Sequence, residues 1–402
     1  MKKILRTLYL LLGIFIILQA SDYDEIQKLV ASDRAEGDSF CWSISISGDY
    51  AIVGAYSEDD DASGDNTLSA AGSAYIFKLD GTSWSQKAKL MASDRAAGDN
   101  FGTSVSISGD YAIIGAVRED DKGSAYIFMR DGSNWSQQAK LVAADRAVDD
   151  KFGVSVSISG DYAIVGAHFE DEDASGNNTQ SNAGSAYIFM RDGINWSQGA
   201  KLVASDRARI DYFGHSVSIS GDYAIVGASN TTRGAGSAYI FKRDGTNWSQ
   251  QAKLVASDRA ENDWFGISIS ISGDYAIVGA QGEDEDASGN NTLDGAGSVY
   301  IFSMPAPEVS AINIPSAFLL HQNYPNPFNP TTAINYKLST VSDIELSIFD
   351  MNGKKVATLV NGSKPAGYHS VKWDASNVGS GIYFYRLQAG SFVETKKMVF
   401  MK

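Results

Sequence analysis

The chain has few of the residues on which common catalytic and redox sites depend. Its 402 residues include one cysteine, Cys41, and four histidines, His168, His215, His321 and His369. A single cysteine cannot form an intrachain disulfide, and it excludes zinc–thiolate centres and thiol relays. The histidines lack metal-binding spacing, and the chain has no nucleophile elbow or phosphate-binding loop. The sequence therefore predicts a protein without catalysis.

Long apolar runs are missing too, except at the N-terminus. Residues 1–20 begin with three basic residues, continue with a mostly apolar stretch over residues 8–18 and end on Ala20. This order is typical of a secretory signal peptide, and the stretch is shorter than the roughly 20 residues that a spanning helix needs. We expect the signal to be removed, leaving no transmembrane span.

Positive charge is scarce relative to negative charge. Lysine and arginine number 33, against 48 aspartates and glutamates, which gives a net charge of −15. Loss of the basic signal peptide makes the mature chain more acidic still. Such a chain is not attracted electrostatically to nucleic acid or to anionic membranes. Its expected charged partners are cations, above all divalent ones.

The most informative feature present is a repeat, because a fixed period indicates the architecture. Five copies of one pattern run from residue 32 to residue 302. The phrase FGTSVSISGDYAIIGA at residues 101–116 recurs, slightly varied, from Phe40, Phe152, Phe213 and Phe265. A GSAYIF-like phrase follows each time, then AKLVASDRA or a close variant in the first four copies. The first, third and fifth copies carry an additional acidic insert between the first two phrases.

Each copy contains short runs with the two-residue alternation of β-strands. In the second copy these runs are residues 103–108, 111–116, 124–128 and 135–143, and Gly-Asp and Asp-Gly turns connect two of the pairs. Each copy is therefore expected to be a four-stranded antiparallel meander. A meander of about fifty residues is typical of a propeller blade. We predict an all-β chain with a five-bladed β-propeller over residues 21–302.

The ends of the repeat region suggest how the ring closes. The fifth copy stops after residues 300–302 and lacks a fourth strand, whereas residues 25–31, EIQKLVA, match a spare fourth strand ahead of the first copy. We therefore expect residues 25–31 to pair with the last blade and protect its edge. Such a clasp favours a closed ring of five blades.

The repeat landmarks resemble those of a known family. Phe-Gly and Gly-Ala pairs begin and end the phrase in the second to fifth copies, at residues 101–102 and 115–116, 152–153 and 166–167, 213–214 and 227–228, and 265–266 and 279–280. They resemble the FG-GAP repeats of integrin α-chain propellers, and more closely the bacterial variety. The first copy departs, with Cys41 after Phe40. Integrin-type blades hold calcium between their first two strands, but that link here is only Ser-Gly-Asp, so the family's calcium site does not carry over.

The C-terminal segment resembles a second family. The motifs NYPNPFNPTTAINYKL from Asn323, IELSIFDMNGKKVATLVNG from Ile344, GYHSVKWDASNVGSGIYFYRLQAG from Gly367, and KKMVFMK at the end resemble the type A sorting domain of the type IX secretion system. The resemblance covers residues 314–402, after a linker at residues 303–313. It implies an immunoglobulin-like β-sandwich, the type IX secretion machinery as partner, and a secreted or outer-membrane cell-surface location. Alternating strands and an Asn352-Gly353 hairpin independently favour a sandwich.

Strand direction places the acidic inserts and the SDRA connections together on one face, where scaffolds tend to carry binding loops. The insert of the third copy has oxygen ligands at alternate positions from Asp171 and a glycine in the sixth place, as a calcium loop requires. Two interpretations stay open, a calcium site of weak affinity and a solvated acidic loop. The candidate calcium ligands are Asp59, Asp61, Ser63, Asp171, Asp173, Ser175, Asp284, Asp286 and Ser288.

Two other side-chain sets recur in the repeats. The Asp-Arg pairs, at residues 33–34, 94–95, 145–146, 206–207 and 258–259, are either a ring of ligand contacts or links within and between blades. Packing is the favoured interpretation, because identical placement in every blade is what packing imposes. The same reasoning favours outer-strand packing over sugar stacking for the tryptophans at positions 84, 135, 196 and 248.

These observations predict a secreted or cell-surface binding or adhesion module for an extracellular glycan or protein. Two alternatives stay open, because fold does not determine function. One is a secreted propeller hydrolase acting on glycans, and the other is a structural component of the envelope.

Overall fold

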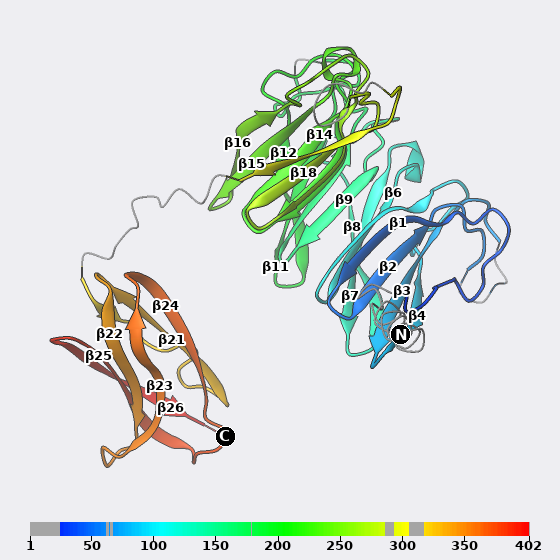
Figure 1. Cartoon of the computed structure of the whole chain (residues 1–402). Coiled ribbons are helices and arrows are strands. Elements are labelled where there is room, and N and C mark those ends of the chain that lie inside the picture. The colour runs from blue at the N-terminus through cyan, green and yellow to red at the C-terminus, as the bar shows by residue number, and fades with distance from the viewer. Residues whose placement is uncertain are drawn as a thin grey trace, which may run out of the picture. The chain divides into compact units, whose positions relative to one another are not determined.

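The computed structural model describes residues 25–61, 64, 67–177, 179–285, 293–304 and 317–401 (Figure 1). The chain divides into two compact units, Met1–Met304 and Pro305–Lys402. The expected signal peptide and most of the expected linker lie outside the described residues. Within the described part, the secondary structure is almost entirely strand, with one short 3₁₀ turn at Glu119–Asp121 and one short helix, α2, at Thr231–Gly234.

Five antiparallel sheets form the first unit, and each sheet comes from one repeat. They are β1-β2-β3-β4, β5-β6-β7-β8, β9-β10-β11-β12, β13-β14-β15-β16 and the three-stranded β17-β18-β19. The bounds are β1 Phe40–Ser47, β2 Tyr50–Ala55, β3 Ser73–Asp80, β4 Ser83–Leu90, β5 Phe101–Ser108, β6 Tyr111–Ala116, β7 Ser124–Asp131, β8 Asn134–Leu141, β9 Ser155–Ser159, β10 Tyr162–Ala167, β11 Ser185–Asp192, β12 Asn195–Leu202, β13 Phe213–Ser220, β14 Tyr223–Ala228, β15 Ser237–Asp244, β16 Asn247–Leu254, β17 Phe265–Ser272, β18 Tyr275–Ala280 and β19 Ser298–Ser303.

The strands of a repeat connect through the tight turns that the sequence predicts. In the second repeat, Gly109 and Gly132 have φ of 57° and 63°, the left-handed region that glycine adopts without a steric penalty. The Arg130 side chain also bonds to the Asp110 carboxylate, and so links the two turns at this end of the sheet. The predicted four-stranded meander is thereby confirmed.

Each sheet, called a blade from here on, packs face to face on the next blade along the chain. The forward face of a blade is the one that packs on its successor, and the rear face is the opposite one. At the second interface, Ile113 and Ile127 on the forward face of blade two lie against Phe152 and Val165 on the rear face of blade three. These four side chains are fully buried. The core of the unit is therefore divided among equivalent interfaces between blades, as in propeller-like repeat folds.

The backbones of neighbouring blades come closest where the Gly-Ala landmark of one meets the Phe-Gly landmark of the next. A Cβ atom on Gly115 would lie 2.0 Å from the carbonyl oxygen of Gly153. The Ser104 hydroxyl donates to the same oxygen over 2.8 Å. No side chain fits in this space, so glycine at this position lets the sheets approach closely.

The expected pairing of residues 25–31 with the last blade is wrong in this structure. The Gln27 carboxamide instead bonds to the backbone N–H and C=O of Trp84 in β4, each over 2.8 Å. The fifth blade keeps three strands. Among the described residues the two end blades do not pack on each other, so residues 25–31, which are bonded to blade one, do not reach blade five. Accordingly, Ile46 on the rear of blade one is 66% exposed, and Ile301 on the front of blade five is 70% exposed.

The second unit consists of two antiparallel sheets around one core. The sheets are β20-β21-β24 and β23-β22-β25-β26. Their bounds are β20 Leu319–Leu320, β21 Thr331–Leu338, β22 Ser342–Phe349, β23 Lys355–Lys364, β24 Gly367–Asp374, β25 Gly381–Ala389 and β26 Phe392–Phe400. Ile334 of one sheet and Leu346 and Tyr385 of the other are buried in the shared core. The expected hairpin at Asn352-Gly353 connects β22 to β23, with the Gly353 N–H donating to the Asp350 carbonyl over 3.0 Å.

Candidate functional site

One end of the blades carries the candidate site. The connection that enters the first strand of a blade and the one that leaves its second strand lie at this same end, because the two strands are antiparallel. Neighbouring repeats meet here, since the Phe101 N–H donates to the Ala71 carbonyl at the end of the preceding repeat's insert. This end is called the loop face. The acidic inserts and the SDRA connections both belong to it, as predicted.

A buried ionic network recurs beneath the loop face. In the third blade, the Lys201 ammonium lies 2.6 Å from the Asp145 carboxylate and 2.9 Å from that of Glu170. The Tyr187 hydroxyl donates to Asp145 over 2.9 Å. Asp145 belongs to the connection before this blade, whereas the other three residues belong to the blade itself. The network therefore links successive repeats.

The same arrangement holds in other blades, which settles the interpretation of the Asp-Arg pairs. Asp94 accepts bonds from Tyr126 and Lys140, and Asp206 from Tyr239 and Lys253. The arginine of the third pair, Arg146, bonds to the Glu119 carboxylate over 2.7 Å. The recurring pairs are thus structural links, as the packing interpretation expects.

The repeating tryptophans also prove to be packing residues. Trp135 lies edge-on to Tyr50 with 6.1 Å between ring centroids, and Trp196 has the same relation to Tyr111. Each contact joins the outer strand of a blade to the hairpin of the preceding blade. These rings stabilise the stack, because edge-to-face aromatic pairs contribute beyond the area they bury.

A further aspartate recurs at the start of each blade. Asp150 and Asp211 are 6% exposed, and each accepts the backbone N–H of the alanine three residues earlier, over 2.6 and 2.7 Å. Burial raises the pKa of both carboxyls to about 6, well above the ordinary value for aspartate. Asp38, Asp99 and Asp263 make the equivalent bond, and burial raises their pKa as well.

The candidate calcium ligands have mixed positions. Asp59, Asp171 and Asp284 each accept a backbone N–H eleven residues further on, over 2.6 Å, and so close the base of their inserts. Ser63, Asp286 and Ser288 lie outside the described residues, and Asp61 accepts the Gly64 N–H through its backbone carbonyl.

In the insert of the third copy, Asp173 accepts bonds from the Ser175 hydroxyl and from the backbone N–H groups of Ser175 and Asn177. These bonds lower the pKa of the Asp173 carboxyl. The local turn already uses one oxygen of that carboxylate and the Ser175 hydroxyl proton.

A different acidic group converges beside this insert. Carboxylate oxygens of Asp145, Glu170 and Glu172 lie within 4.8 Å of one another. They border a cavity of about 250 Å³ that Asp149 and Asp150 also line. However, the Lys201 ammonium and the Tyr187 hydroxyl already bond to two of the three carboxylates. The donors present are those of a neutralised ionic network, and they do not fit a metal centre.

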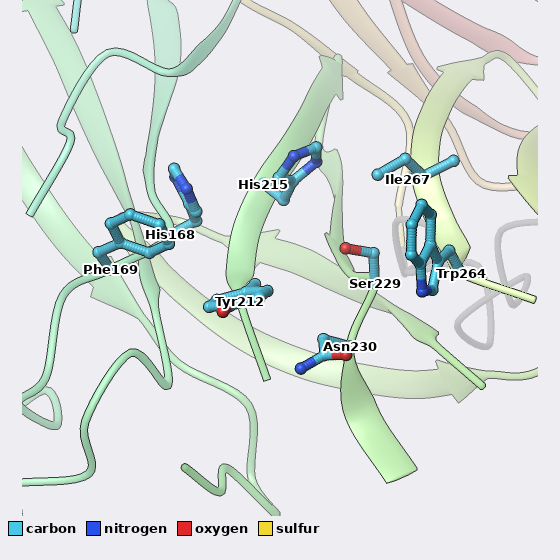
Figure 2. Close-up of a pocket in the computed structure, with 8 residues that line it drawn as sticks. All are labelled: His168, Phe169, Tyr212, His215, Ser229, Asn230, Trp264 and Ile267. Carbon is cyan, nitrogen blue, oxygen red and sulfur yellow. The ribbon is translucent and has the colours of Figure 1, made fainter. Parts of the chain in front are cut away.

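The most distinctive feature of the loop face is an aromatic pocket of about 270 Å³ (Figure 2). Three successive repeats contribute to it. The lining residues are His168 and Phe169 after β10, Tyr212 and His215 at the start of β13, Ser229 and Asn230 after β14, and Trp264 and Ile267 at the start of β17. Figure 2 shows the Trp264 indole opposite Tyr212 and His215, with Ser229 and Asn230 between them.

Burial favours the neutral form of the two histidines of this aromatic pocket. Their rings lie edge-on with 5.4 Å between centroids. Burial lowers the pKa of His168 to about 3, and it lowers the pKa of His215 too. The Nδ1 atoms of both rings are buried and lack a hydrogen-bond partner among the described residues. The pocket thus offers uncharged imidazoles between aromatic faces.

Two of the aromatic residues have an unusual backbone. Tyr212 and Trp264 have φ of 57° and 55°, a left-handed conformation that is rare for bulky side chains. The same position is Ser39, Asn100 or Lys151 in the other repeats, also with positive φ. Aromatic residues at a strained position are a reason to suspect a function.

Sequence reasoning missed this pocket, because it searched for residues that recur. The residues of this pocket are instead found at positions that differ among the five copies, although the residues around them repeat. The column of His215 holds Trp42, Thr103, Val154 and Ile267, and the column of His168 holds Tyr56, Val117, Ser229 and Gln281. Aligning the five copies and selecting the variable columns of the loop face would have found it.

The stacked four-stranded sheets and the loop face define a propeller-like repeat protein. Residues 23–77, 84–128, 135–189, 196–241 and 248–302 match the FG-GAP repeat family, and the chain belongs to that family. Residues 322–401 match a secretion system C-terminal sorting domain of the type IX kind. The protein is accordingly exported, to the cell surface or the medium.

Among solved structures, the chain is similar to PorZ, described as an essential bacterial surface component of the type-IX secretion system of Porphyromonas gingivalis. The two are 12% identical with a TM-score of 0.34, over 89% of this chain and 51% of PorZ. The chain thus spans about half the length of that structure. No curated protein matches the chain. Of the helices in the described residues, none is long and apolar enough to cross a membrane.

Proposed function

We propose that the protein is a surface-displayed adhesion module that binds neutral glycans in the aromatic pocket. The observation that carries this proposal is the pocket itself, which Trp264, Tyr212 and Phe169 line beside uncharged polar groups. Ligand pockets typically combine an apolar lining with a few convergent polar groups. Its position on the loop face of an exported repeat scaffold supports the same role.

The chemistry of the pocket favours sugars without charge. Aromatic rings pack against the C–H faces of pyranose rings, and neutral imidazole, hydroxyl and carboxamide groups exchange hydrogen bonds with sugar hydroxyls. The imidazole rings of His168 and His215 and the side chains of Ser229 and Asn230 supply such groups to the pocket lining. The net charge of −15 disfavours sulfated or sialylated ligands by long-range repulsion.

The test is binding of the mature protein to a glycan array, followed by calorimetry with a neutral glycan that binds. Trp264→Ala should weaken binding at least tenfold, about 1.4 kcal/mol, because one stacking face is lost. His215→Ala should weaken it too. Trp42→Ala is the matched control, because Trp42 is also an exposed tryptophan of the loop face but lies outside the pocket, and it should leave affinity unchanged.

Preferential binding of anionic glycans, or unchanged affinity in Trp264→Ala, would contradict the proposal. The same samples test the two other interpretations. Release of shortened glycan, measured by mass spectrometry, would identify a hydrolase. Absence of any binding by a folded protein would favour a structural envelope component. No observation in the described residues specifically favours either of these.

Calcium binding by the acidic inserts is a separate proposal. Asp171 and Asp173 each use Oδ1 for backbone N–H bonds, so the protein would offer an ion only the remaining oxygens of these groups. Few protein ligands mean weak affinity. Calorimetric titration of calcium into the mature protein should give a millimolar-range signal that the double variant Asp171→Asn, Asp173→Asn loses, and absence of heat would remove the metal hypothesis.

The sorting domain supports a partner and a mode of display. We infer that the type IX secretion machinery recognises the second unit, whose two sheets share one core. The immunoglobulin-like topology that the resemblance implies stays a prediction. The FG-GAP unit then acts outside the cell, where its loop face meets extracellular ligands.

A further inference from the structure

We propose that copies of this chain assemble head to tail, with blade one of one copy packed on blade five of another and residues 25–31 completing the fifth blade. Within the described part of the FG-GAP unit, no further blade covers either partner face, and both faces carry the same residue types that the internal interfaces bury. This inference does not depend on the glycan proposal.

The forward face of blade five is apolar and exposed. Ile277, Val299 and Ile301 are 42%, 62% and 70% exposed. The residues at the same positions of blade two, Ile113, Ala125 and Ile127, are fully buried against blade three. The fifth blade thus presents an interface surface that has no partner among the described residues of the FG-GAP unit.

The rear face of blade one is the complementary surface, and it too has exposed apolar side chains. Ile44 and Ile46 are both 66% exposed, whereas their equivalents in blade two, Val105 and Ile107, are 5% and 4% exposed against blade one. Each end of the unit is therefore one half of an interface that occurs four times inside it. Contact between two such halves is heterologous, so it can continue from copy to copy.

Residues 25–31 already occupy the position of a fourth strand from a preceding blade. The Ser32 N–H donates to the Gln86 carboxamide over 3.0 Å. Ser93, which follows the fourth strand of blade one, bonds to Gln137 of blade two in the same way over 2.9 Å. Blade one thus holds the segment in place, ready to lie beside β19 of another copy.

In the described part of the chain, the buried network of blade five lacks the lysine that the other blades have, and residues 25–31 contain a lysine that could supply it. Blades one to four have a lysine on the fourth strand that bonds to the buried network, as Lys201 does with Asp145 and Glu170. Within the described residues, no lysine bonds to Glu283 or Asp258 in blade five, and only the Tyr300 hydroxyl joins them. Glu283 is 2% exposed. Lys28 stands at the equivalent position in residues 25–31 and is exposed.

The register of the other blades gives the pairing. Tyr75 lies opposite Lys89, and Ile76 opposite Ala88, between β3 and β4. By equivalence, Tyr300 of one copy lies opposite Lys28 of the next, and Ile301 lies opposite Gln27. The lysine then reaches the Glu283 carboxylate, and the exposed isoleucines are covered.

The test is analytical ultracentrifugation of the mature protein with two blocking variants. Gly279→Ala blocks the forward end, because a Cβ atom on the internal glycines at this position would lie within 2.1 Å of the next blade's backbone. A Cβ on Gly279 meets only Ser268 of its own blade, at 3.6 Å. Ile44→Asp blocks the rear end. Ile194→Asp is the control, since Ile194 is equally exposed, at 70%, on a hairpin tip.

Wild type and the control should increase in mass with concentration, and each blocking variant alone should stay monomeric. An equimolar mixture of the two blocking variants should give a dimer and nothing larger, because each supplies the end that the other lacks. Monomeric wild type at all concentrations would overturn the proposal. So would assembly lost in Gly279→Ala but kept in Ile44→Asp, which indicates a symmetric contact.

Closure within one chain is the remaining outcome to exclude. In a Cys41→Ser background, Gln27→Cys and Ile301→Cys should form a disulfide between chains, visible as a ladder on non-reducing gels. A disulfide within a single chain would show that the ring closes on itself, and would overturn the proposal.

Discussion

At the scale of single residues, recurring aspartates hold the loop face together. In the sequence they are not distinguished from the many other acidic residues of the chain. The aspartate before each Phe-Gly landmark is buried and caps a turn, and the aspartate of the SDRA phrase joins a lysine and a tyrosine in blades two to four. Their recurrence was visible in the sequence, but their burial was not. Asp211 illustrates the consequence, because burial raises its pKa to about 6.

Asp211→Asn should change how stability depends on pH. The pKa of Asp211 is higher in the folded protein than in the unfolded chain, so the folded state binds this proton more tightly between pH about 4 and 6. The group therefore stabilises the fold at the acidic end of this window, and that contribution is lost as pH rises through about 6. Two pKa units correspond to about 3 kcal/mol at most.

The measurement is the urea unfolding midpoint of wild type and Asp211→Asn from pH 4 to 7. The unfolding midpoint of the variant should rise relative to that of wild type as pH rises, because its carboxamide keeps the acceptor oxygen without the buried charge. Asp131→Asn, in an exposed hairpin turn, is the control for the loss of a carboxylate that is not buried. If the unfolding midpoints of wild type and Asp211→Asn differ by the same amount from pH 4 to 7, the Asp211 carboxyl does not titrate in this window.

At the scale of elements, the alternation of the sequence was enough to place the strands. Residues 111–116 were expected as a strand and form β6, and the expected run 135–143 corresponds to β8 at Asn134–Leu141. The turns were predictable as well, because glycine marks them chemically. What the pattern could not give is the distance between sheets, since that depends on the residues of two blades at once.

Glycine-to-alanine substitutions in the second strands test this spacing. A Cβ on Gly227 would lie 2.0 Å from the Gly266 carbonyl oxygen, whereas Gly279, in the same YAIVGA sequence of blade five, has no backbone closer than 3.6 Å. Gly227→Ala should destabilise the FG-GAP unit by about 1–3 kcal/mol or more, because the blades must separate.

Gly279→Ala should leave the stability of the monomer unchanged. Thermal unfolding at low protein concentration compares the two variants, which differ only in the blade that carries the added methyl group. Equal losses in both would mean that the close approach between blades is not what requires glycine at this position.

At the scale of the whole molecule, the repeats, their number and the sorting domain could be predicted, but the closure of the ring could not. Closure depends on the rotation between successive blades. Side-chain packing determines this rotation, and it cannot be deduced from the length of the repeat. The aromatic pocket escaped for a related reason. His168, Tyr212, His215 and Trp264 occupy separate repeats, and only the stacking of blades three to five brings them together.

The equivalence of the interfaces between blades has one more consequence. The forward faces of the blades resemble one another, and so do the rear faces. A segment equal in length to one repeat could therefore be duplicated or deleted, and the blades on either side would still find matching surfaces. The number of blades is thus free to change while every junction stays the same. New ligand specificity would then need only a few altered side chains at the variable columns, on a backbone that need not change at all.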